Sequence, residues 1–543
     1  MHNLESLFRQ KVSSGLSRSS VKRCSQWACK YRYMGKPFPG VWTFDHHPWL
    51  RELHDDDSEH VVVQKAAQMG FTEWVLNTAF YYIDNHGESV LYVLPTDNDA
   101  SDFSASRFDP ALQLSDHLRN LFSDVQNVGH KRAGSANLFV RGSRSKSQLK
   151  SIPAGVLIFD EIDEMVQSNV PLALERASGQ LKKIIRMLST ATIPGHGINA
   201  YYQDSTQSSF FFKCPHCGKL ITLTLENLIV TADSLTDPGI RDSHLVCGLC
   251  KNTLHHAAKS TYLRNGIYVP EHIDRDIKGY YVNQLYSPTV TPVDIAKSVI
   301  KARSNPAEEQ ELYNSKLGLC HTVEGAKITD QAIIDCTAHH VKSQSRTTPK
   351  PLTLGIDVGK WLHCVVYEWS FDTDIVGDLS TQGRPRLLQE TKVLNFEDLD
   401  KLMHEFRINA GVIDANPESR KSLEFCQRFP GLVYRCYYGN AVHGRHVSYN
   451  DDLLAVTVDR TSWLDLTLGR FHQRHIRLPV DLSLEYKEQA KAPVRIYKKD
   501  SQGNPIATYV KAEKDDDHFA HASNYAEIAL AVMQVGNTNM QSY

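Results

Sequence analysis

The segment 65–72 (KAAQMGFT) combines residue types that bind nucleotide phosphates. A phosphate-binding loop needs a glycine for close backbone approach, a lysine that reaches the phosphates and a hydroxyl that ligates Mg²⁺. Gly70 and Thr72 stand at the usual spacing, but Phe71 occupies the lysine position, so only Lys65 can supply the charge. The pattern is equally compatible with an ordinary turn between a strand and a helix.

Four apolar residues followed by two acids, at 156–161, predict a buried strand with an acidic C-terminal end. At that place Asp160 can hold Mg²⁺ and Glu161 can orient the attacking water in ATP hydrolysis. A buried strand that ends in a solvated acidic loop is the alternative. The next acids, Asp163 and Glu164, are expected to begin a helix.

Four cysteines form two CxxC pairs that are separated by 29 residues: Cys214, Cys217, Cys247 and Cys250. Four thiolates in two short turns can chelate one tetrahedral Zn²⁺ and leave no open position, so the predicted site is structural. A coincidental spacing is the alternative. The total of 11 cysteines is odd, which fits a reducing compartment better than a disulfide framework.

A second set of acids lies near the C-terminal end of the chain. Asp357 ends a predicted strand, Asp414 ends a later one, and Asp517 begins a late helix. An RNase H-like fold gathers such groups around two metal ions, about 3.5–4 Å apart, for phosphodiester cleavage. Solvated acids at strand ends are the alternative.

The elements that must position these residues alternate between strands and helices, which predicts an α/β fold with a parallel sheet. We expect strands at 61–63, 89–94, 155–159 and 184–188 and a helix at 73–85. After a polar, proline-containing stretch, we expect strands at 352–357, 363–369, 386–394, 411–414 and 432–438, with helices at 396–408, 418–427, 453–468 and 519–535.

The length of 543 residues suits three or four domains. We expect a basic segment at 1–40, a P-loop (ASCE-type) ATPase domain at 41–203, a zinc-ribbon-like module at 204–260, a connecting subdomain at 261–341, a linker at 342–351 and an RNase H-like nuclease domain at 352–543. No window contains 18 consecutive apolar residues, so we expect a soluble, intracellular protein.

The formal net charge is −2, so contact with a nucleic acid must come from local basic patches. Residues 1–36 hold eight Lys and Arg against one acid, and residues 131–150 hold six against none. The basic residues before the acidic strand can contact the DNA backbone or a nucleotide, or can be solvated: Arg141, Arg144, Lys146 and Lys150. The run 189–192 stands where many nucleic-acid translocases carry a coupling segment, although a plain turn fits it equally well.

Several stretches, taken in order, resemble the large terminase subunit of tailed bacteriophages, the DNA-packaging ATPase and nuclease, in its lambda-like branch. The resemblance extends from about residue 38 to residue 535. The stretches are PFPGVWTFDHHPWL, QKAAQMGFTE, VLPTDNDASDFSASRFDP, SIPAGVLIFDEID, FFFKCPHCGK and DHFAHASNYAE.

The resemblance implies roles for residues of the first domain. Lys65 matches the displaced phosphate-loop lysine of this branch, and Thr72 matches the Mg²⁺ ligand. Two further matches are Asp160 to the Walker B aspartate and Glu161 to the catalytic glutamate. The aromatic residues Phe44 and Trp49 fall where the family grips adenine, and an aromatic core is equally compatible.

The resemblance also implies the nuclease residues. Asp357 and Asp414 match the first two nuclease acids. The third position, which usually holds an acid, is His521 here. Asp517 lies four residues earlier on the same helical face, so either or both can reach the metal.

The implied protein is a motor that hydrolyses ATP with Mg²⁺ (or Mn²⁺) to move double-stranded DNA into a procapsid, carries Zn²⁺ and cuts concatemeric DNA. Its expected partners are double-stranded DNA, a small terminase subunit, the portal protein and further copies in a ring, with no membrane, in the host cytoplasm. The alternative is a zinc-containing recombinase or transposase-like nuclease whose first domain only binds DNA. A structural DNA-binding protein with decayed sites is a third possibility, against which the pairing of Thr72 with Asp160 and Glu161 argues.

Overall fold

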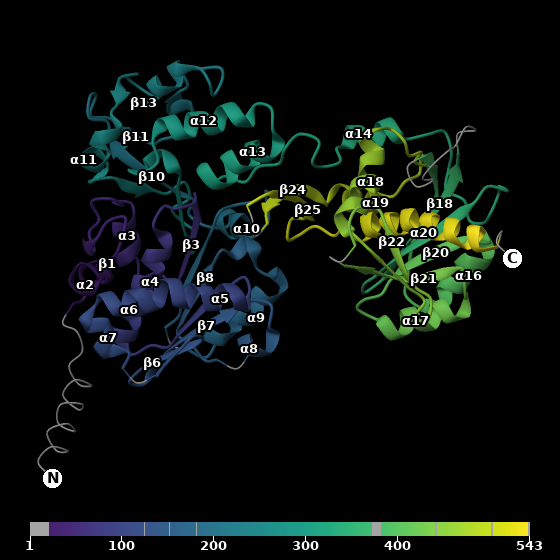
Figure 1. Cartoon of the computed structure of the whole chain (residues 1–543), viewed down its shortest axis with the longest axis horizontal. Helices are drawn as coiled ribbons and strands as arrows, with labels where there is room; N and C mark the ends of the chain where they lie inside the picture. Colours follow the sequence, from purple (N-terminus) through teal and green to yellow (C-terminus); the bar gives the residue numbers. More distant parts are fainter. Residues whose placement is uncertain are drawn as a thin grey trace, which may run out of the picture. The chain divides into compact units, whose positions relative to one another are not determined.

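The computed structural model describes residues 21–123, 125–150, 152–180, 182–371, 382–439, 442–500 and 503–540. It divides into two compact units, Met1–His321 and Thr322–Tyr543 (Figure 1). Residues 1–20 of the predicted basic segment lie outside the described residues. No helix in the described part of the chain is long and apolar enough to cross a membrane.

The division between the units precedes the predicted linker at 342–351, so that placement is wrong. The Lys342 backbone N–H donates to Asp481 at 2.9 Å, and the Ser343 N–H donates to the Leu388 carbonyl at 2.8 Å. These residues are therefore part of the second unit. A polar composition indicates exposure, but it does not reveal whether the backbone is already hydrogen-bonded to a neighbouring strand or turn.

Among the described residues, unit 1 has an eleven-stranded sheet in the order β11-β10-β16-β3-β9-β8-β4-β7-β6-β5, with β15 paired to β10. Its predicted strands are confirmed as β3 (His60–Lys65), β4 (Val90–Leu94), β8 (Val156–Asp160) and β9 (Ile184–Ser189). The other strands are β5 (Val125–Asn127), β6 (His130–Ala133), β7 (Ala136–Gly142), β10 (Ser208–Lys213), β11 (Leu220–Ile221), β15 (Ile267–Val269) and β16 (Lys278–Val282).

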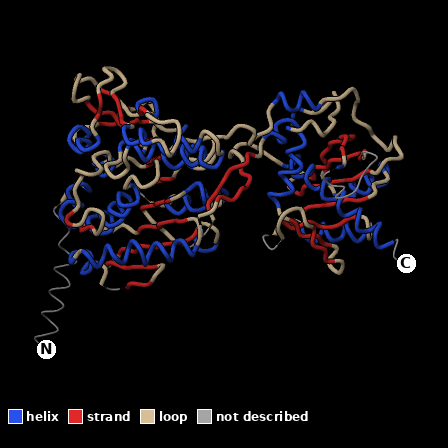
Figure 2. The backbone as a smooth tube through the Cα atoms, turned by 45° about the horizontal axis from the view of Figure 1, so that its top comes forward, coloured by secondary structure: helices blue, strands red, loops and turns tan. Residues whose placement is uncertain are grey.

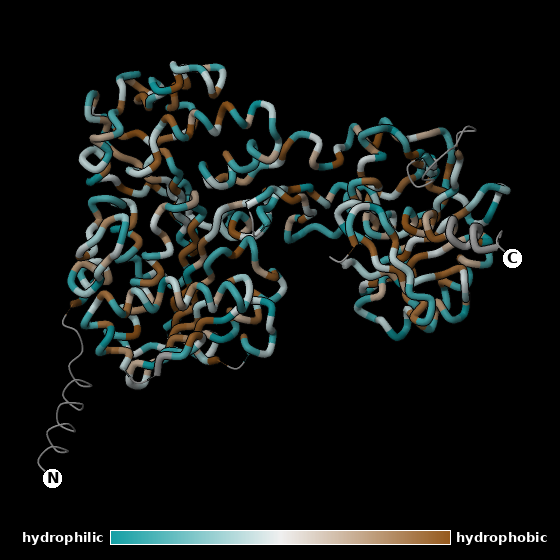
Figure 3. Tube along the Cα trace, viewed as in Figure 1, coloured by the Kyte–Doolittle hydropathy of each residue, from teal (hydrophilic) through white to brown (hydrophobic). Residues whose placement is uncertain are grey.

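The order of the central strands determines where the candidate site forms. β3, β9, β8 and β4 are parallel neighbours, so their carboxyl ends lie at one edge of the sheet. Both faces of β3 are covered, because Val61 and Val63 pack into one core and Val62 into another. Figure 3 shows the apolar residues concentrated along these strands.

Helices flank the strands of this sheet (Figure 2). The predicted helix at 73–85 corresponds to α4 (Phe71–Tyr81) and the π-helical turn Tyr82–His86 that follows it. The remaining elements are α2 (Cys24–Tyr31), β1 (Tyr33–Met34), β2 (Gly40–Val41), α3 (Leu50–Asp55), α5 (Asp97–Phe103), α6 (Asp109–Leu114), α7 (Asp116–Leu121), α8 (Lys146–Lys150), α9 (Val170–Leu174), α10 (Ile198–Gln203), α11 (Lys259–Leu263), α12 (Pro292–Ala302) and α13 (Pro306–Glu311).

The segments 204–260 and 261–341 are less separate than the sequence predicts. β10, from the first, and β16, from the second, both join the main sheet, and β16 pairs directly with β3. Only the small antiparallel sheet of β12 (Leu228–Ile229), β13 (His244–Val246) and β14 (Thr253–Leu254) stands apart from it. The predicted boundaries therefore cut through one continuous sheet.

Unit 2 is built on a sheet with the order β19-β18-β17-β20-β21-β23-β22 among its described residues. β17, β18 and β19 are antiparallel, whereas β20, β21 and β23 run parallel to β17. The strands are β17 (Leu352–Val358), β18 (Leu362–Ser370), β19 (Arg384–Val393), β20 (Ala410–Asp414), β21 (Val433–Tyr438), β22 (Val447–Asn450) and β23 (Ala455–Val458), with a separate hairpin of β24 (Val494–Lys499) and β25 (Pro505–Val510).

Helices cover both faces of this sheet. One core contains side chains of α16 (Phe396–Phe406) and α17 (Ser419–Arg428), and two others contain side chains of α20 (His518–Met540). Gly355 allows the close approach of α20, because a Cβ there would collide with the backbone of Ala522 and Ala526. The other helices are α14 (Asp330–Cys336), α18 (Arg460–His472) and α19 (Leu484–Lys491).

The predicted helix at 453–468 is wrong in its first part. Ala455–Val458 forms β23, which pairs with β21, and α18 begins only at Arg460. The Asp459 side chain accepts a hydrogen bond from the Ser462 N–H at 2.7 Å and caps the helix. The β-branched Val456, Thr457 and Val458 favour the strand before this cap.

A buried ion pair joins α18 to α20. Arg470 Nη2 donates to Glu527 Oε2 at 2.9 Å, and both side chains are at most 2% exposed. Burial raises the pKa of Glu527, and the charge of Arg470 opposes that rise. The pair is therefore needed to keep two charged groups inside unit 2.

We predict that Glu527→Leu strongly destabilises α18 and α20, because it leaves the Arg470 guanidinium buried without a counter-charge. Breaking such a pair from one side costs about 3–5 kcal/mol. Hydrogen exchange of peptides from these two helices measures the loss of protection. As a control, Arg474→Ala removes an exposed partner of Asp335 and should leave the protection unchanged. Equal protection in the two variants would contradict the prediction.

Candidate functional site

The loop after β3 adopts the conformation that its glycine allows. Gly70, immediately before α4, has φ +82°, and Gln68 has φ 59°. A Cβ at Gly70 would stand 3.0 Å from the His47 ring, so a larger residue is excluded by space as well as by φ. Two side chains brace the loop from behind: Trp49 Nε1 donates to the Met69 carbonyl at 3.0 Å, and Gln284 Nε2 donates to the Ala67 carbonyl at 2.8 Å.

Lys65 reaches the acidic end of β8 across the intervening strand β9. Its Nζ lies 2.8 Å from Glu161 Oε1, and the lysine is 5% exposed. Burial alone would lower the pKa of Lys65, but the carboxylates of Glu161 and Asp160 outweigh it and raise the pKa above its usual value. The ammonium group is thus held in its charged form.

Asp160 is buried and only partly satisfied. Tyr92 Oη donates to its Oδ2 at 2.6 Å, whereas its Oδ1 has no hydrogen-bond partner among the described residues. Burial and the charge of Glu161 raise the pKa of Asp160 to about 6, while Lys65 and the hydroxyls of Tyr92 and Thr72 oppose the rise. A free carboxylate oxygen beside a hydroxyl is a donor set that fits Mg²⁺.

Tyr92 was not predicted as a site residue. It stands in the otherwise aliphatic strand β4, opposite Ile158 of β8. A single phenol in a fully buried strand requires a polar partner. That requirement, together with the neighbouring acidic strand, is the signal that could have identified it.

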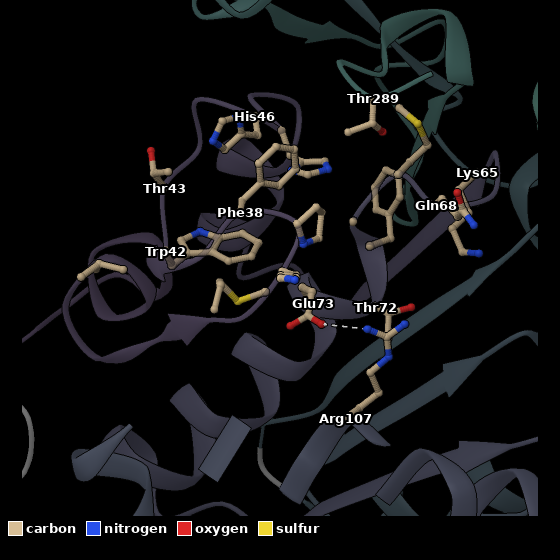
Figure 4. Close-up of a pocket in the computed structure, with 18 residues that line it drawn as sticks. Phe38, Trp42, Thr43, His46, Lys65, Gln68, Thr72, Glu73, Arg107 and Thr289 are labelled. Carbon is tan, nitrogen blue, oxygen red and sulfur yellow. Dashed lines mark ion pairs between the residues drawn. The ribbon is translucent and has the colours of Figure 1, made fainter. Parts of the chain in front are cut away.

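A cavity of about 370 Å³ opens beside the loop (Figure 4). Its walls come from the loop, from the first turn of α4 and from the segment 34–47, which contributes Phe38 and Trp42. The predicted adenine-binding residues Phe44 and Trp49 do not line it. Both are buried, at 3% and 1% exposure, so they pack in the core behind the loop.

Arg107 is one of the basic side chains that line this cavity, with Lys36 and Lys65. Arg107 Nη1 lies 3.7 Å from Glu73 Oε1, and its side chain is 56% exposed. The other carboxylate oxygen of Glu73 pairs with the buried Arg32 at 2.5 Å. Glu73 is therefore held by Arg32, and the guanidinium of Arg107 is the more loosely held of the two.

Asp163 is not a solvated acid, although it lies in a 3₁₀ turn, Ile162–Glu164. Its carboxylate accepts hydrogen bonds from the Thr192 backbone N–H at 2.9 Å, from the Thr192 hydroxyl and from the Ile198 N–H at 2.7 Å. Burial raises its pKa to about 6. Asp163 thus fixes the segment that follows β9.

That segment, 189–192, connects Glu161 to the last residues of unit 1. Ser189 Oγ donates to Glu161 Oε2 at 3.3 Å. At the other end, the Thr192 carbonyl accepts hydrogen bonds from Asn314 Nδ2 at 2.9 Å and from the His321 backbone N–H at 3.0 Å. The run is not a plain exposed turn.

The basic residues that were predicted to contact DNA or a nucleotide differ in whether the fold already binds their side chains. Arg141 donates to the carbonyls of Gly129 and Val140, at 2.5 and 2.8 Å, so its guanidinium is committed to the fold. Arg144, Lys146 and Lys150 are exposed. Of the four residues singled out in the sequence, these three are therefore the ones that can meet a polyanion.

The four cysteines come together in unit 1. One sulfur atom from each of Cys214, Cys217, Cys247 and Cys250 lies within 4.8 Å of the others, and Cys214 Sγ is 3.9 Å from Cys250 Sγ. Tetrahedral Zn–S bonds of about 2.3 Å separate their sulfur atoms by roughly 3.8 Å. The Asn252 backbone N–H is the first of the groups that lower the pKa of Cys250 to about 6. The donor set fits Zn²⁺.

In unit 2 the sheet brings Asp357 and Asp414 together at the ends of neighbouring parallel strands, β17 and β20. Burial and the charge of Asp357 raise the pKa of Asp414 to about 6. The other two predicted ligands form a pair of their own, with Asp517 Oδ2 at 3.3 Å from His521 Nε2. His521 Nδ1 also lies 3.0 Å from Tyr438 Oη.

Two histidines that were not predicted lie closer to Asp357. His518 Nδ1 is 2.7 Å from Asp357 Oδ2, and His363 stacks on the His518 ring. His363 is the cross-strand partner of Asp357 in the β17–β18 hairpin. The spacing of the two predicted strands could have revealed this pair, since a tight turn between 358 and 362 fixes the register.

The chain is similar to large terminase subunits of phages. Residues 36–268 match the family model for the ATPase domain of the phage terminase large subunit gpA. The large terminase subunit of Escherichia phage lambda is 23% identical over 359 residues, which cover 57% of this chain and 53% of that protein. That of Enterobacteria phage P21 is 23% identical over 412 residues, which cover 66% and 62%. The matches thus span little more than half of these relatives.

Among solved structures, the large terminase of bacteriophage HK97 is similar over 94% of this chain and 99% of that one. The TM-score is 0.52 and the identity is 10%, so the likeness concerns the fold alone. Together, the sequence and fold comparisons confirm the resemblance to phage large terminases.

Proposed function

We propose that this chain, which resembles the phage large terminases, hydrolyses ATP to drive DNA packaging and carries a separate site that cuts DNA. One observation carries the proposal. Lys65 and Thr72 line one cavity, and the buried Lys65 contacts Glu161, which directly follows an Asp160 with an unpartnered oxygen among the described residues. Charge neutralisation, metal ligation and water activation are the three tasks of ATP hydrolysis.

Each residue has a role that follows from its position. Lys65 neutralises phosphate charge, and Thr72 and Asp160 are the groups that would hold Mg²⁺, which supplies electrostatic stabilisation of the transferred phosphoryl group when bound. Glu161 is the general base for water. Because Lys65 holds Glu161 at 2.8 Å, the two must separate before the lysine can serve the phosphates and the glutamate the water.

The base of the nucleotide needs an apolar, aromatic wall. Phe38 and Trp42 line the cavity, so we assign this contact to them in place of the predicted Trp49 and Phe44. Arg107, which lines the same cavity from a different element, is placed to meet a phosphate. Gly70 permits the close backbone approach that a phosphate requires.

The second site is proposed as a metal-dependent nuclease of RNase H-like topology. Its carboxylates Asp357 and Asp414 end adjacent parallel strands, where two cations can be shared between them. His521 lies on α20, the helix that packs on β17 and β20, and its partner Asp517 immediately precedes that helix. Its part in metal binding remains a prediction.

The larger context of the proposal follows from the resemblance. We expect the substrate to be concatemeric double-stranded DNA in the host cytoplasm, and the partners to be a small terminase subunit, the portal of a procapsid and further copies in a ring. The exposed Arg144, Lys146 and Lys150 are candidate DNA contacts. The alternative, a recombinase whose first domain only binds DNA, does not account for the cavity at Lys65 and Asp160.

We predict that Glu161→Gln lowers ATP turnover by about 10²–10⁴-fold while nucleotide binding is retained, because a positioned general base contributes that much. Lys65→Ala should instead weaken both binding and turnover. Measurements of steady-state ATP hydrolysis and of nucleotide affinity on the intact chain distinguish the two variants, because only Lys65→Ala should lower the affinity. Glu164→Gln, which changes an exposed carboxylate nearby, is the matched control. Normal turnover in Glu161→Gln would remove this residue from the reaction.

We predict that Asp357→Ala abolishes Mg²⁺- or Mn²⁺-dependent cleavage of plasmid DNA and leaves ATP hydrolysis intact, because the two sites belong to separate compact units. Asp414→Ala should behave in the same way. Asp451→Ala, at an exposed position of unit 2, should cut normally. Cleavage by Asp357→Ala at the wild-type rate would rule out the proposed site.

We predict one structural Zn²⁺ per chain, held by the four cysteines. Cys217→Ser should lose the metal and fold poorly, since the binding energy of structural zinc is folding energy. Elemental analysis of the purified protein measures the content. Cys29→Ser changes an exposed cysteine outside the cluster and should keep the zinc. A full zinc content in Cys217→Ser would disprove the assignment.

A further inference from the structure

Three metal-binding side chains converge at the end of β17. One donor atom from each of Asp357, His363 and His518 lies within 4.8 Å of the other two. Asp357 Oδ2 and His518 Nδ1 are 2.7 Å apart, and the two imidazole rings stack at 4.6 Å with 12° between their planes. The three come from adjacent strands and from the start of α20, which are rigid elements of the fold.

His363 is the least expected member of this group. It is 4% exposed, and its Nδ1 has no hydrogen-bond partner among the described residues. A buried imidazole nitrogen without a partner costs free energy unless it meets a donor or a cation. The register pairs His363 directly with Asp357, and one nitrogen of the His363 ring lies within 4.8 Å of that carboxylate, which is already assigned to metal binding.

A carboxylate lies near the other nitrogen of the same ring. Glu485 Oε1 is 3.8 Å from His363 Nε2, and Lys392 holds that carboxylate at 2.8 Å. Histidine ligands of metals commonly have such a carboxylate near their second nitrogen.

We propose that Asp357, His363 and His518 form a mixed nitrogen and oxygen site that selects a divalent transition ion such as Mn²⁺ over Mg²⁺. Metal bonds of about 2.1 Å at right angles separate their ligand atoms by roughly 3 Å, close to the distance between Asp357 and His518. Imidazole suits transition metals, whereas Mg²⁺ prefers oxygen ligands. Gly359 leaves room for the His518 ring, since a Cβ there would stand 3.2 Å from it.

The proposal rests on the proposed nuclease only through the shared residue Asp357. It concerns ligands other than the predicted Asp517 and His521, which form a pair of their own at 3.3 Å. His518 lies between them in sequence, and in a helix adjacent positions face different directions.

The test measures metal binding to the intact, nucleotide-free chain. Titration calorimetry with Mn²⁺ and with Mg²⁺ gives the two affinities, and pulsed electron paramagnetic resonance of bound Mn²⁺ detects directly coordinated imidazole nitrogen. We expect Mn²⁺ to bind at least about tenfold more tightly than Mg²⁺, with a nitrogen signal. His363→Ala and His518→Ala should each weaken Mn²⁺ binding by about 10–100-fold and reduce that signal.

Two further variants make the outcome specific. His363→Asp exchanges a nitrogen donor for an oxygen donor and should shift the preference towards Mg²⁺. His404→Ala, an exposed histidine on α16, should change neither the affinity nor the signal. If His363→Ala keeps the wild-type affinity and nitrogen signal, or if the loss occurs only in His521→Ala, the proposal is wrong.

The two proposals can fail separately. Absence of DNA cleavage with every metal, combined with a nitrogen signal that depends on His363, would reject the nuclease and retain the metal site. Cleavage that requires Asp357 and Asp414 and proceeds equally in His363→Ala, with no nitrogen signal, would retain the nuclease and reject the mixed ligand set.

Discussion

The ion pair between the buried Lys65 and Glu161 is the interaction on which the cavity beside the loop depends. Lys65 lies at the end of β3, and Glu161 and Asp160 lie at the end of β8, with β9 between them. Buried charges are tolerated only when they are paired, so this contact requires the three strands to keep their register. The conformation of the loop, the position of Thr72 and the cavity itself all follow from that edge of the sheet.

Unit 2 also places acidic residues at the ends of neighbouring parallel strands, but without a counterpart, among its described residues, of the lysine that pairs with them in unit 1. In the described part of the chain no lysine pairs with Asp357 or Asp414, and burial together with the charge of Asp357 raises the pKa of Asp414. A bound cation would oppose that rise. In both units the sheet places carboxylates at strand ends. In unit 1 the balancing positive charge is the side chain of Lys65, whereas the carboxylates of unit 2 suit a bound metal ion.

The sequence pattern predicted most strands and the acidic site residues at their ends. A short apolar run indicates a buried strand, and the acids that follow it indicate where the strand ends. The pattern could not place Tyr92, His363 or His518, since these residues acquire their partners through pairing between strands or packing of α20. The linker at 342–351 and the start of the helix at 453 failed for a related reason. Both stretches are held by hydrogen bonds to residues that are distant in sequence. The Lys342 N–H donates to Asp481, and β23 pairs with β21.

The segment after β9 joins Glu161 to the end of unit 1 through a series of hydrogen bonds. Ser189 Oγ donates to Glu161 Oε2, the Thr192 N–H donates to Asp163, and the Thr192 carbonyl accepts from the His321 N–H. His321 is the last residue of unit 1, so this series ends where the polypeptide leaves the unit. Under the proposed function, a change in the position of Glu161 would be transmitted along these hydrogen bonds to that point.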